Sequence, residues 1–598
     1  MMETTDLSAA DREQDSPTQS SFRPSFHVTA PSGWLNDPCG PGYDPSTGLY
    51  HIFFQWNPHG NVWGNMSWGH ATSRDLVSWD TNIKPAIEPS AEYDYKGVFT
   101  GCLHATDIDG SPGGLTIAYT SVSNLPIHYT LPYVIGSETL SLAVSSDGGE
   151  TWQRSESNPI LPGPPSNLSV TGWRDPSLTM WNPGGKNNES SSLYGVISGG
   201  IVDKSPTAFI YKLDATNLRN WEYAGPLIDV GLNFCPSRWS GDFGINWEVA
   251  NLMTLTNTSG DTRDFVIIKV EGASFPEKES FAPDAARRTR HPRLQQWMCL
   301  RPSHNHRMVD DPLTEYAFAG ILDHGCFLAA NAFCDPITSQ HLVYGWITEE
   351  DLSTERRLRQ GWSSLISLPR VVQLSTLENV LRARKSPLQS ITSLEVVPGS
   401  SEDTYTVHTL GIRPEPRLSG LRRGCEERQP QDVTLPGKLS DAPSHFIALV
   451  SGQWELMAEI AVSQTCNRVG IQVAHDSKFE HCTTLAWHPE DETFTIHRPP
   501  PEDADTNHGF DSAPHTLFTY KTEQDEETEE NLQVHAFFDQ SVLEVFVNER
   551  TVISTRVYHS AGRCYGVRFF AEVGGDDVVH GVTKLVRASA WDGIGKRV

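Results

Sequence analysis

Three segments of the sequence repeat the same pattern, an acidic turn followed by a tryptophan. They read SRDLVSW, SSDGGETW and LDATNLRNW, and they end at Trp79, Trp152 and Trp221, at intervals of 73 and 69 residues. The second fits the pattern S-x-D-x-G-x-T-W, known as an Asp-box, in which the aspartate caps a hairpin and the tryptophan packs between sheets. A hairpin that recurs at these intervals leaves room for about four strands in each repeat. The repeat therefore predicts small sheets arranged radially around an axis.

Short β-patterned runs alternate with turn clusters along the rest of the chain, and long amphipathic helices are absent. The runs include LYHIFFQW (49–56), LTIAYTSV (115–122), LYGVISGG (193–200), DFVIIKV (264–270) and HLVYGWIT (341–348). Five such units fit between residues 25 and 375, which predicts an all-β fold with a five-bladed β-propeller over residues 25–375. The flanking predictions are a disordered polar segment at 1–24, a helical or extended linker at 376–399, and a C-terminal β-sandwich at 400–598.

The charge balance limits the partners that such a chain can bind. Its 74 acidic residues outnumber the 46 basic ones, for a formal net charge of −28. This argues against nucleic acid and anionic membranes as partners, since both require a basic footprint. The sequence contains no run of 18 apolar residues, the length that would be needed to span a bilayer. The first thirty residues contain no apolar leader, so a cytoplasmic location is expected.

The sequence also contains no pattern that indicates a metal site, a cofactor site or disulfide bonds. The ten cysteines form no C-x-x-C pair, so neither a disulfide framework nor a zinc site is predicted. The His-x-His of RPSHNHRM (301–308) has no third ligand at metal spacing and is interpreted as a polar loop. Phosphate-loop and dinucleotide-binding glycine patterns are missing as well. We therefore expect no metal and no cofactor.

Three carboxylates stand in conspicuous surroundings where three of the repeat units begin. They are Asp37 in WLNDPCG, Asp175 in GWRDPSL and Glu248 in INWEVANL. Any single Asp-Pro is more often a plain turn. A propeller, however, gathers ligands where the innermost strands of its blades converge, so three tryptophan-flanked acids at equivalent places predict one shared site. Proline is expected to hold the preceding aspartate extended, Arg174 to keep Asp175 ionised, and an apolar tryptophan wall to raise the pKa of Glu248.

Longer segments around these acids resemble a known enzyme family. WLNDPCG, WRDPSL and NWEVANL are similar to the three acidic motifs of glycoside hydrolase family 32, which contains invertases, inulinases and fructosyltransferases. Supporting segments match in the same order, among them GVFTGC (97–102), YGWITE (344–349), GWSSLISLPR (361–370) and FDQSVLEVFVNERTVISTRVY (538–558). The resemblance covers roughly residues 25–590. It implies a five-bladed propeller followed by a β-sandwich, and residues 125–149 are similar to fungal fructosyltransferases in particular.

By matching position, the resemblance implies a role for each acid. Asp37 would be the nucleophile that attacks C2 of a β-fructofuranosyl unit. Glu248 would be the acid that protonates the departing sugar and later the base that activates the acceptor, and Asp175 would grip fructose hydroxyls without reacting. Such a retaining mechanism requires the two reacting carboxyl groups to lie about 5–5.5 Å apart. The positions that match fructose-contacting residues are Asn36, Gln55, Trp63, Phe99, Thr100 and Arg174, although ordinary packing would equally account for Trp63 and Phe99.

The sequence departs from the family pattern beside two of the acids. Leu35 and Cys39 stand where Met and Asn are usual, and residues 249–251 read Val-Ala-Asn instead of Cys-Pro-Asp. Thr100 replaces a usual Ser and keeps the hydroxyl. No catalytic group is lost, but these changes leave open which product is made.

The expected function is a retaining β-fructofuranosidase-type enzyme that takes fructose from sucrose and passes it to a second sucrose, giving kestose-type products, or to water. A plain invertase or a hydrolase of inulin fits the same residues, because the competition between water and sugar depends on acceptor affinity. From another class, a sugar-binding propeller without turnover is the alternative, whereas a sialidase role lacks its arginine cluster and tyrosine nucleophile. The expected partners are sucrose and fructo-oligosaccharides, and a homodimer through the sandwich is left open.

Overall fold

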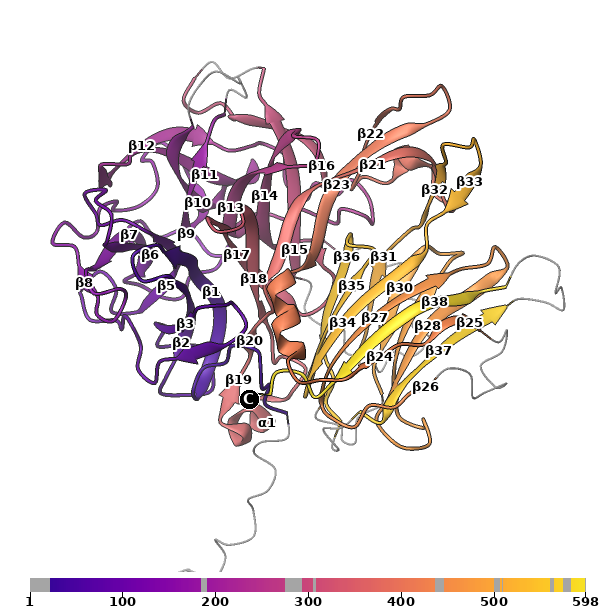
Figure 1. Cartoon of the computed structure of the whole chain (residues 1–598). Helices are drawn as coiled ribbons and strands as arrows, with labels where there is room; N and C mark the ends of the chain where they lie inside the picture. Colours follow the sequence, from indigo (N-terminus) through magenta and orange to yellow (C-terminus); the bar gives the residue numbers. More distant parts are fainter. Residues whose placement is uncertain are drawn as a thin grey trace, which may run out of the picture.

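A computed structural model of the chain describes residues 22–183, 191–274, 293–304, 308–435, 446–499, 506–507, 509–559, 564–573 and 582–596. Within these residues nearly all regular structure is β-strand, and the strands form two bodies that lie side by side (Figure 1). The first is a ring of five sheets and the second a pair of sheets, so the predicted all-β propeller and sandwich are confirmed. Most of the predicted disordered segment 1–24 lies outside the described residues. No helix in the described part of the chain is long and apolar enough to cross a membrane.

Four blades of the ring are built from consecutive antiparallel strands, and a fifth sheet completes it. Blade 1 contains β1 (Gly33–Asp44), β2 (Leu49–Asn57), β3 (Ser67–Ser73) and β4 (Trp79–Thr81); blade 2 contains β5 (Gly97–His104), β6 (Leu115–Val122), β7 (Glu138–Ser145) and β8 (Gln153–Arg154); blade 3 contains β9 (Val170–Trp181), β10 (Ser192–Ile201), β11 (Ser205–Asp214) and β12 (Asn217–Pro226); blade 4 contains β13 (Asn246–Thr256), β14 (Thr262–Glu271), β15 (Leu294–Pro302) and β16 (Thr314–Asp323); blade 5 begins with β17 (Phe327–Asp335) and β18 (Gln340–Ile347). The first strands of successive blades contact one another, and β17 contacts β1. These five strands therefore surround the axis of a closed ring. The ring is also tied where it closes, because β19 (Trp362–Ser363) pairs in parallel with β1.

The repeated tryptophans occupy equivalent places in blades 1 to 3. Each follows the hairpin between the third and fourth strands, and each indole Nε1 donates a hydrogen bond to the carbonyl three residues earlier, at 3.2 Å for Trp79, 3.1 Å for Trp152 and 3.0 Å for Trp221. The turn aspartate accepts backbone N–H groups, as Asp147 does from Thr151 at 2.9 Å. The period in the sequence is thus the period of the blades.

The first strand of every blade carries a bulge at the same point. In each, two residues leave the ladder opposite one residue of the second strand, the arrangement that bends a strand and re-aims its side chains. The bulged pairs are Asn36–Asp37, Phe99–Thr100, Asp175–Pro176, Val249–Ala250 and Ala329–Ala330. Three of these residues, Asp175, Val249 and Ala329, have φ values of 60°, 48° and 53°. Five equivalent distortions therefore meet around the axis.

Residues 376–399, predicted to be a helical or extended linker, contain the end of one β-strand, a short helix and a second strand. β21 (Arg370–Ala383) pairs with β18 and continues to pair with β23 (Tyr405–Pro414) and β32 (Phe518–Lys521), while β22 (Glu395–Pro398) pairs with β23. The buried side chains of Val380 and Ala383 are three residues apart in β21, which is a helix-like spacing. It arises because the register of this strand shifts between 377 and 380 and again between 380 and 382.

The second domain is a sandwich of two sheets that enclose one apolar core. One sheet has the order β24 (Glu427–Arg428), β38 (Lys584–Asp592), β27 (Gln453–Ala461), β34 (Leu532–Asp539), β35 (Val542–Val547) and β36 (Thr551–Arg556), with β25 (Gln431–Thr434) beside β38; the other has the order β26 (Phe446–Ile447), β37 (Gly566–Val573), β28 (Cys466–Ala474), β29 (Cys482–His488), β30 (Thr493–His497) and β31 (Phe510–Pro514). Three short helices lie between strands: α1 (Thr354–Gln360), η2 (Leu388–Ser390) and η3 (Pro416–Arg422). The remaining short strands are β20 (Leu365–Ile366) and β33 (Glu527–Glu529).

The N-terminal residues of the described chain fasten the sandwich to the propeller. The backbone N–H groups of Ser25 and Phe26 donate to the Asp539 carboxylate at 2.8 and 2.9 Å. The imidazole of His27 lies between Asp539 Oδ2 at 2.9 Å and Glu544 Oε1 at 3.0 Å, and all three side chains are fully buried. Burial lowers the pKa of His27, but the two carboxylates outweigh it and raise the pKa to about 9. A charged histidine thus holds the two domains together.

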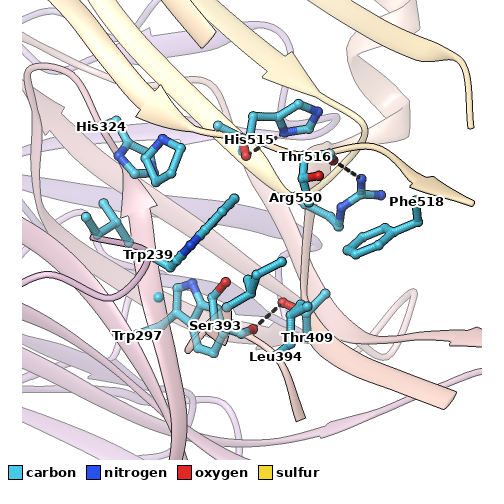
Figure 2. Close-up of a pocket in the computed structure, with 15 residues that line it drawn as sticks. Trp239, Trp297, His324, Ser393, Leu394, Thr409, His515, Thr516, Phe518 and Arg550 are labelled. Atoms are coloured by element: carbon cyan, nitrogen blue, oxygen red, sulfur yellow. Dashed lines mark hydrogen bonds between the residues drawn. The ribbon is translucent and has the colours of Figure 1, made fainter. Parts of the chain in front are cut away.

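A small cavity marks another part of the contact between the domains. Figure 2 shows Trp239 and His324 from the propeller facing His515 and Arg550 from the sandwich. The polar groups of the sandwich side are already paired, because Arg550 binds Glu530 at 2.8 Å and the His515 ring contacts the Thr551 hydroxyl at 2.9 Å. The cavity volume of about 40 Å³ has room for a few waters and is far below that of a sugar site.

Candidate active site

The sequence-predicted site residues meet at the bulges of the first strands. Asn36, Asp37, Phe99, Thr100 and Asp175 are themselves bulged residues. Arg174 and Glu248 directly precede a bulge, Gln55 is the β2 residue opposite one, and Trp63 lies in the loop after β2. The structure thus places eight of the nine predicted residues at one level of the channel, and it adds charged neighbours that the sequence did not indicate.

Asp37 is held by neutral donors at the end of a short chain of hydrogen bonds. Thr100 Oγ1 donates to Asp37 Oδ2 at 2.8 Å, and Gln55 Nε2 donates in turn to Thr100 Oγ1 at 3.2 Å. Asn36 Nδ2 donates to Asp37 Oδ1 at 3.2 Å, while Trp34 Nε1 donates to Asn36 Oδ1 at 3.1 Å. Burial raises the pKa of Asp37 and the Glu248 charge raises it further, against a lowering by Lys269. Asp37 is therefore oriented from both oxygens.

Glu248 is held by two cations, one on each carboxylate oxygen. Arg174 donates to Oε1 through Nε at 3.1 Å and through Nη2 at 2.9 Å, and Lys269 Nζ contacts Oε2. Burial raises the pKa of Glu248, but Lys269 and Arg174 outweigh it and hold the pKa well below its ordinary range. The expected rise in this pKa is therefore wrong, because the residues adjacent to Glu248 in the sequence do not indicate a contact with Lys269.

Asp175 differs from the sequence expectation in backbone and in charge. Its φ of 60° is left-handed, not extended, because it lies in the β9 bulge. Its backbone N–H donates to Thr120 Oγ1 at 2.7 Å, and its Oδ2 accepts from the Val249 N–H at 3.1 Å. Burial raises the pKa of Asp175 well above its usual range, and Arg174 lowers it only in part, because the guanidinium forms its ion pairs with three glutamates instead.

Two aromatic side chains form an open edge of the site. The Trp63 side chain is 50% exposed and meets Phe99 edge to face, with ring centroids 6.0 Å apart. Phe99 is half-buried and packs on the core cluster around Trp34, so packing accounts for much of its role. Trp63 is not a core residue, and its exposed ring offers an apolar face to a bound sugar.

Asparagines at the channel hold the bulges in place, and the sequence reasoning missed them. Asn331 Nδ2 donates to the carbonyls of Pro38 and Gly101 at 3.2 and 3.0 Å, which ties blade 5 to blades 1 and 2. Asn251 Nδ2 donates to the carbonyls of Val249 and Ala330 at 3.0 and 3.2 Å. Both residues end a bulge, and they satisfy carbonyls that the broken ladder leaves unpaired.

Two family profiles match the chain, and together they span both domains. The profile of the glycosyl hydrolases family 32 N-terminal domain matches residues 27–384, and that of the family 32 C terminal matches residues 417–592. This chain belongs to glycosyl hydrolase family 32. The family resemblance inferred from the three acidic motifs is thereby confirmed, and the N-terminal match contains every bulge of the ring.

Relatives with curated names include β-fructofuranosidases from plants. Beta-fructofuranosidase 1 of Zea mays is 28% identical over 363 residues, which cover 59% of this chain and 48% of the relative. The insoluble isoenzyme 2 of Oryza sativa subsp. indica is 28% identical over 373 residues, which cover 61% of this chain and 56% of the relative. The match thus spans about half the length of these family 32 relatives.

Solved structures of the family share the fold over almost the whole chain. The Aspergillus kawachii β-fructofuranosidase complexed with glycerol is 25% identical with a TM-score of 0.78, and the match covers 96% of this chain and 94% of that one. The fructosyltransferase from A. japonicus has a TM-score of 0.79 at 23% identity, with 96% of each chain covered. The second likeness concerns the fold alone.

Three charged residues of the family 32 site escaped the sequence reasoning. Lys269 interrupts the apolar run of β14, Glu271 ends that strand, and Glu138 begins β7. Arg174 Nη1 donates to Glu138 Oε1 at 3.0 Å and Arg174 Nη2 to Glu271 Oε2 at 3.1 Å, so one guanidinium joins blades 2, 3 and 4. The signal available in the sequence was the charge of Lys269 inside an otherwise apolar strand. The residue that this charge contacts depends on the strand register, which the sequence alone does not give.

The chemistry open to this cluster is that of carboxylates among polar and charged side chains. Among the described residues no group of three or more His, Cys, Asp or Glu side chains has metal-binding geometry. Two carboxylates from different blades, Asp37 and Glu248, influence each other's charge, and hydroxyl, amide and guanidinium groups surround them. Such a site suits a polyol substrate and reaction by acid, base and nucleophile.

Proposed function

We propose that this family 32 chain is a retaining β-fructofuranosidase-type enzyme that cleaves sucrose through a covalent fructosyl-enzyme and passes the fructose to a second sucrose or to water. The observation that carries the proposal is the equivalent placement of two carboxylates, Asp37 on β1 and Glu248 on β13. Each sits at a bulge of a first strand, and each is oriented by its own set of donors. Two carboxylates with separate environments are what a two-step displacement requires.

In the first step Asp37 acts as the nucleophile. An oxygen of its carboxylate attacks C2 of the fructosyl unit, and the bond from C2 to the glycosidic oxygen breaks. Glu248 gives its proton to that oxygen, so glucose leaves as a neutral alcohol and an ester to Asp37 remains. Thr100 and Asn36 fix the direction of attack through their hydrogen bonds to Asp37.

In the second step Glu248 acts as the base. It takes the proton of an acceptor hydroxyl while the acceptor oxygen attacks C2, and the ester bond to Asp37 breaks. With water as acceptor the product is fructose, and with sucrose it is a kestose-type trisaccharide. Asp175 contributes by hydrogen bonding to fructose hydroxyls.

Product analysis tests this proposal directly. The full chain is incubated with sucrose at about 50 mM and at about 1 M, and the sugars are separated by chromatography, because the acceptor concentration decides the partition of one intermediate. Trisaccharide that accumulates with excess free glucose at high sucrose supports transfer. Equal amounts of glucose and fructose at both concentrations support a plain invertase instead. Absence of any products, with sucrose binding retained, would leave a sugar-binding propeller without turnover.

A plain hydrolase is the second candidate, and the site offers one observation for it. Trp63 is half exposed at an open edge of the site, so water has access beside any bound sugar. Inulin incubated in parallel with sucrose separates a fructan hydrolase from an invertase by the substrate that yields fructose faster.

A further inference from the structure

Lys269 faces the proposed acid and base from the neighbouring strand. It is the direct register partner of Glu248 in the ladder between β13 and β14. Its side chain is 12% exposed, that of Glu248 is 14% exposed, and the ammonium contacts Glu248 Oε2. A buried lysine on a carboxylate of the active site is costly unless the pair is well matched, so its presence calls for a functional explanation.

The two cations on Glu248 differ in how firmly each is anchored. Arg174 binds Oε1 and is also held by Glu138 and Glu271, on two further blades. Lys269 binds Oε2 through one flexible aliphatic chain, and the charges of Asp37 and Glu271 also attract it. Of the two cations, Lys269 is therefore the one that can withdraw from Glu248 without breaking a network.

This arrangement opposes the first reaction step. Glu248 must carry a proton when the glycosidic oxygen departs, but both of its oxygens already accept hydrogen bonds from cations. Arg174 already gives Oε1 two hydrogen bonds, so the proton has to go on Oε2, beside the Lys269 ammonium. The positive charge of the ammonium disfavours that proton until the ammonium withdraws.

We propose, on the basis of the function proposed above, that Lys269 is a positioning residue that alternates between Glu248 and Asp37 and so switches Glu248 from acid to base. In the structure the ammonium lies on Oε2, and when Glu248 takes up its proton the ammonium moves toward the Asp37 anion, which also attracts it, and leaves Oε2 to that proton. Once Asp37 is esterified its charge is gone, so the ammonium returns to Oε2 and stabilises the carboxylate that activates the acceptor.

The other charged groups near Lys269 and Glu248 leave Asp37 as the group whose charge changes during the reaction. Asp37, Arg174, Asp175, Glu271 and Arg293 bear on Glu248 or on Lys269, and Glu138 bears on Arg174, so the groups come from four blades. Arg174 remains on Oε1 in both states, so Glu248 keeps its direction while its second oxygen changes partner. Covalent chemistry at Asp37 alone changes the charge that Lys269 experiences.

The test compares Lys269→Met, Lys269→Gln and Lys269→Arg with the unchanged enzyme on two donors. With sucrose, kcat/KM needs protonated Glu248 and falls as pH rises through its pKa. Removal of the ammonium raises that pKa, so the Met and Gln variants are expected to move this alkaline limb upward by about one pH unit or more.

With p-nitrophenyl β-D-fructofuranoside the leaving group needs little protonation, so the second step limits turnover. There the neutral variants are expected to lose about 10- to 100-fold in kcat and to show a burst of nitrophenolate.

The controls separate this proposal from a structural role and from failure of the proposed function. Lys269→Arg keeps the charge and is expected to keep the alkaline limb within half a pH unit of the unchanged enzyme. Lys212→Met removes an exposed lysine of β11 and is expected to change neither readout. An unshifted limb with equal losses on both donors would overturn the switch. Failure of the unchanged enzyme to use either donor would instead overturn the proposed function.

Discussion

Arg174 and Glu248 are joined by two hydrogen bonds to a single carboxylate oxygen, from Nε at 3.1 Å and from Nη2 at 2.9 Å. The same guanidinium reaches Glu138 and Glu271 with its remaining donors. Three acidic side chains from blades 2 and 4 thus share one planar cation on blade 3. The direction of Glu248 depends on this fork, which a point charge cannot reproduce.

Arg174→Lys is therefore expected to reduce kcat/KM for sucrose by about 10²- to 10³-fold, because a lysine can serve only some of the three glutamates at once. Steady-state kinetics on sucrose measures the loss. Arg219→Lys is the matched control, since Arg219 on the outermost strand of blade 3 forms a partly exposed pair with Asp109 of blade 2. A loss of less than threefold in Arg174→Lys would show that the fork does not orient the acid.

The two reacting carboxylates should respond differently to removal. Asp37→Asn is expected to lower turnover of both sucrose and p-nitrophenyl β-D-fructofuranoside by on the order of 10⁴-fold, because no ester can form. Glu248→Gln is expected to lose about 10²- to 10⁴-fold on sucrose and to release only a burst from the nitrophenyl donor.

Sodium azide distinguishes the two variants further. Azide is an anionic acceptor that needs no base, so it should restore nitrophenyl turnover in Glu248→Gln and yield a fructosyl azide. It should restore nothing in Asp37→Asn. Azide rescue of the aspartate variant would assign the nucleophile to another residue.

Features that depend on local sequence could be predicted, and the propeller is the main example. The turn aspartates and the tryptophans that follow them form contacts within a few residues, so their repeat in the sequence is enough to indicate the blades. Asp37, Asp175 and Glu248 could likewise be identified from short motifs. Each motif contains the bulge or directly precedes it, so motif and geometry coincide there.

Features that depend on register or on distant neighbours could not be predicted. Arg174 precedes Asp175 in sequence, but a bulge begins at Asp175, and the guanidinium pairs with glutamates of other blades. Lys269 meets Glu248 only because β14 pairs with β13 in one register. In β21 two register shifts imitate the spacing of a helix, which is why the pattern of residues 376–399 leaves a helical and an extended conformation equally open.

The bulge of blade 5 allows a matched test of backbone strain. Ala329 and Ala330 are both fully buried, but only Ala329 has a positive φ, of 53°. A left-handed backbone costs an L-residue about 1–2 kcal/mol, whereas glycine in an ordinary strand costs about 0.5–1 kcal/mol. Ala329→Gly is therefore expected to leave the free energy of unfolding unchanged or to raise it by up to about 1 kcal/mol. Ala330→Gly is expected to lower it by about 1 kcal/mol. Urea unfolding followed by tryptophan fluorescence gives both values, and equal losses would argue against strain at Ala329.

The clamp of His27 between Asp539 and Glu544 makes the domain contact depend on pH. The folded pKa of about 9 exceeds the ordinary 6.5 of an unfolded histidine, so the stabilisation is fully present below about pH 6.5 and is lost as pH rises through 9. The difference corresponds to about 3 kcal/mol. His27→Gln is therefore expected to unfold at a lower urea concentration than the unchanged chain at pH 6, and the gap should close by about pH 9.5. His304→Gln, at an exposed site, should follow the unchanged chain throughout. If the His27 variant ran parallel to the unchanged chain from pH 6 to 9.5, His27 would not be the charged partner of the two carboxylates.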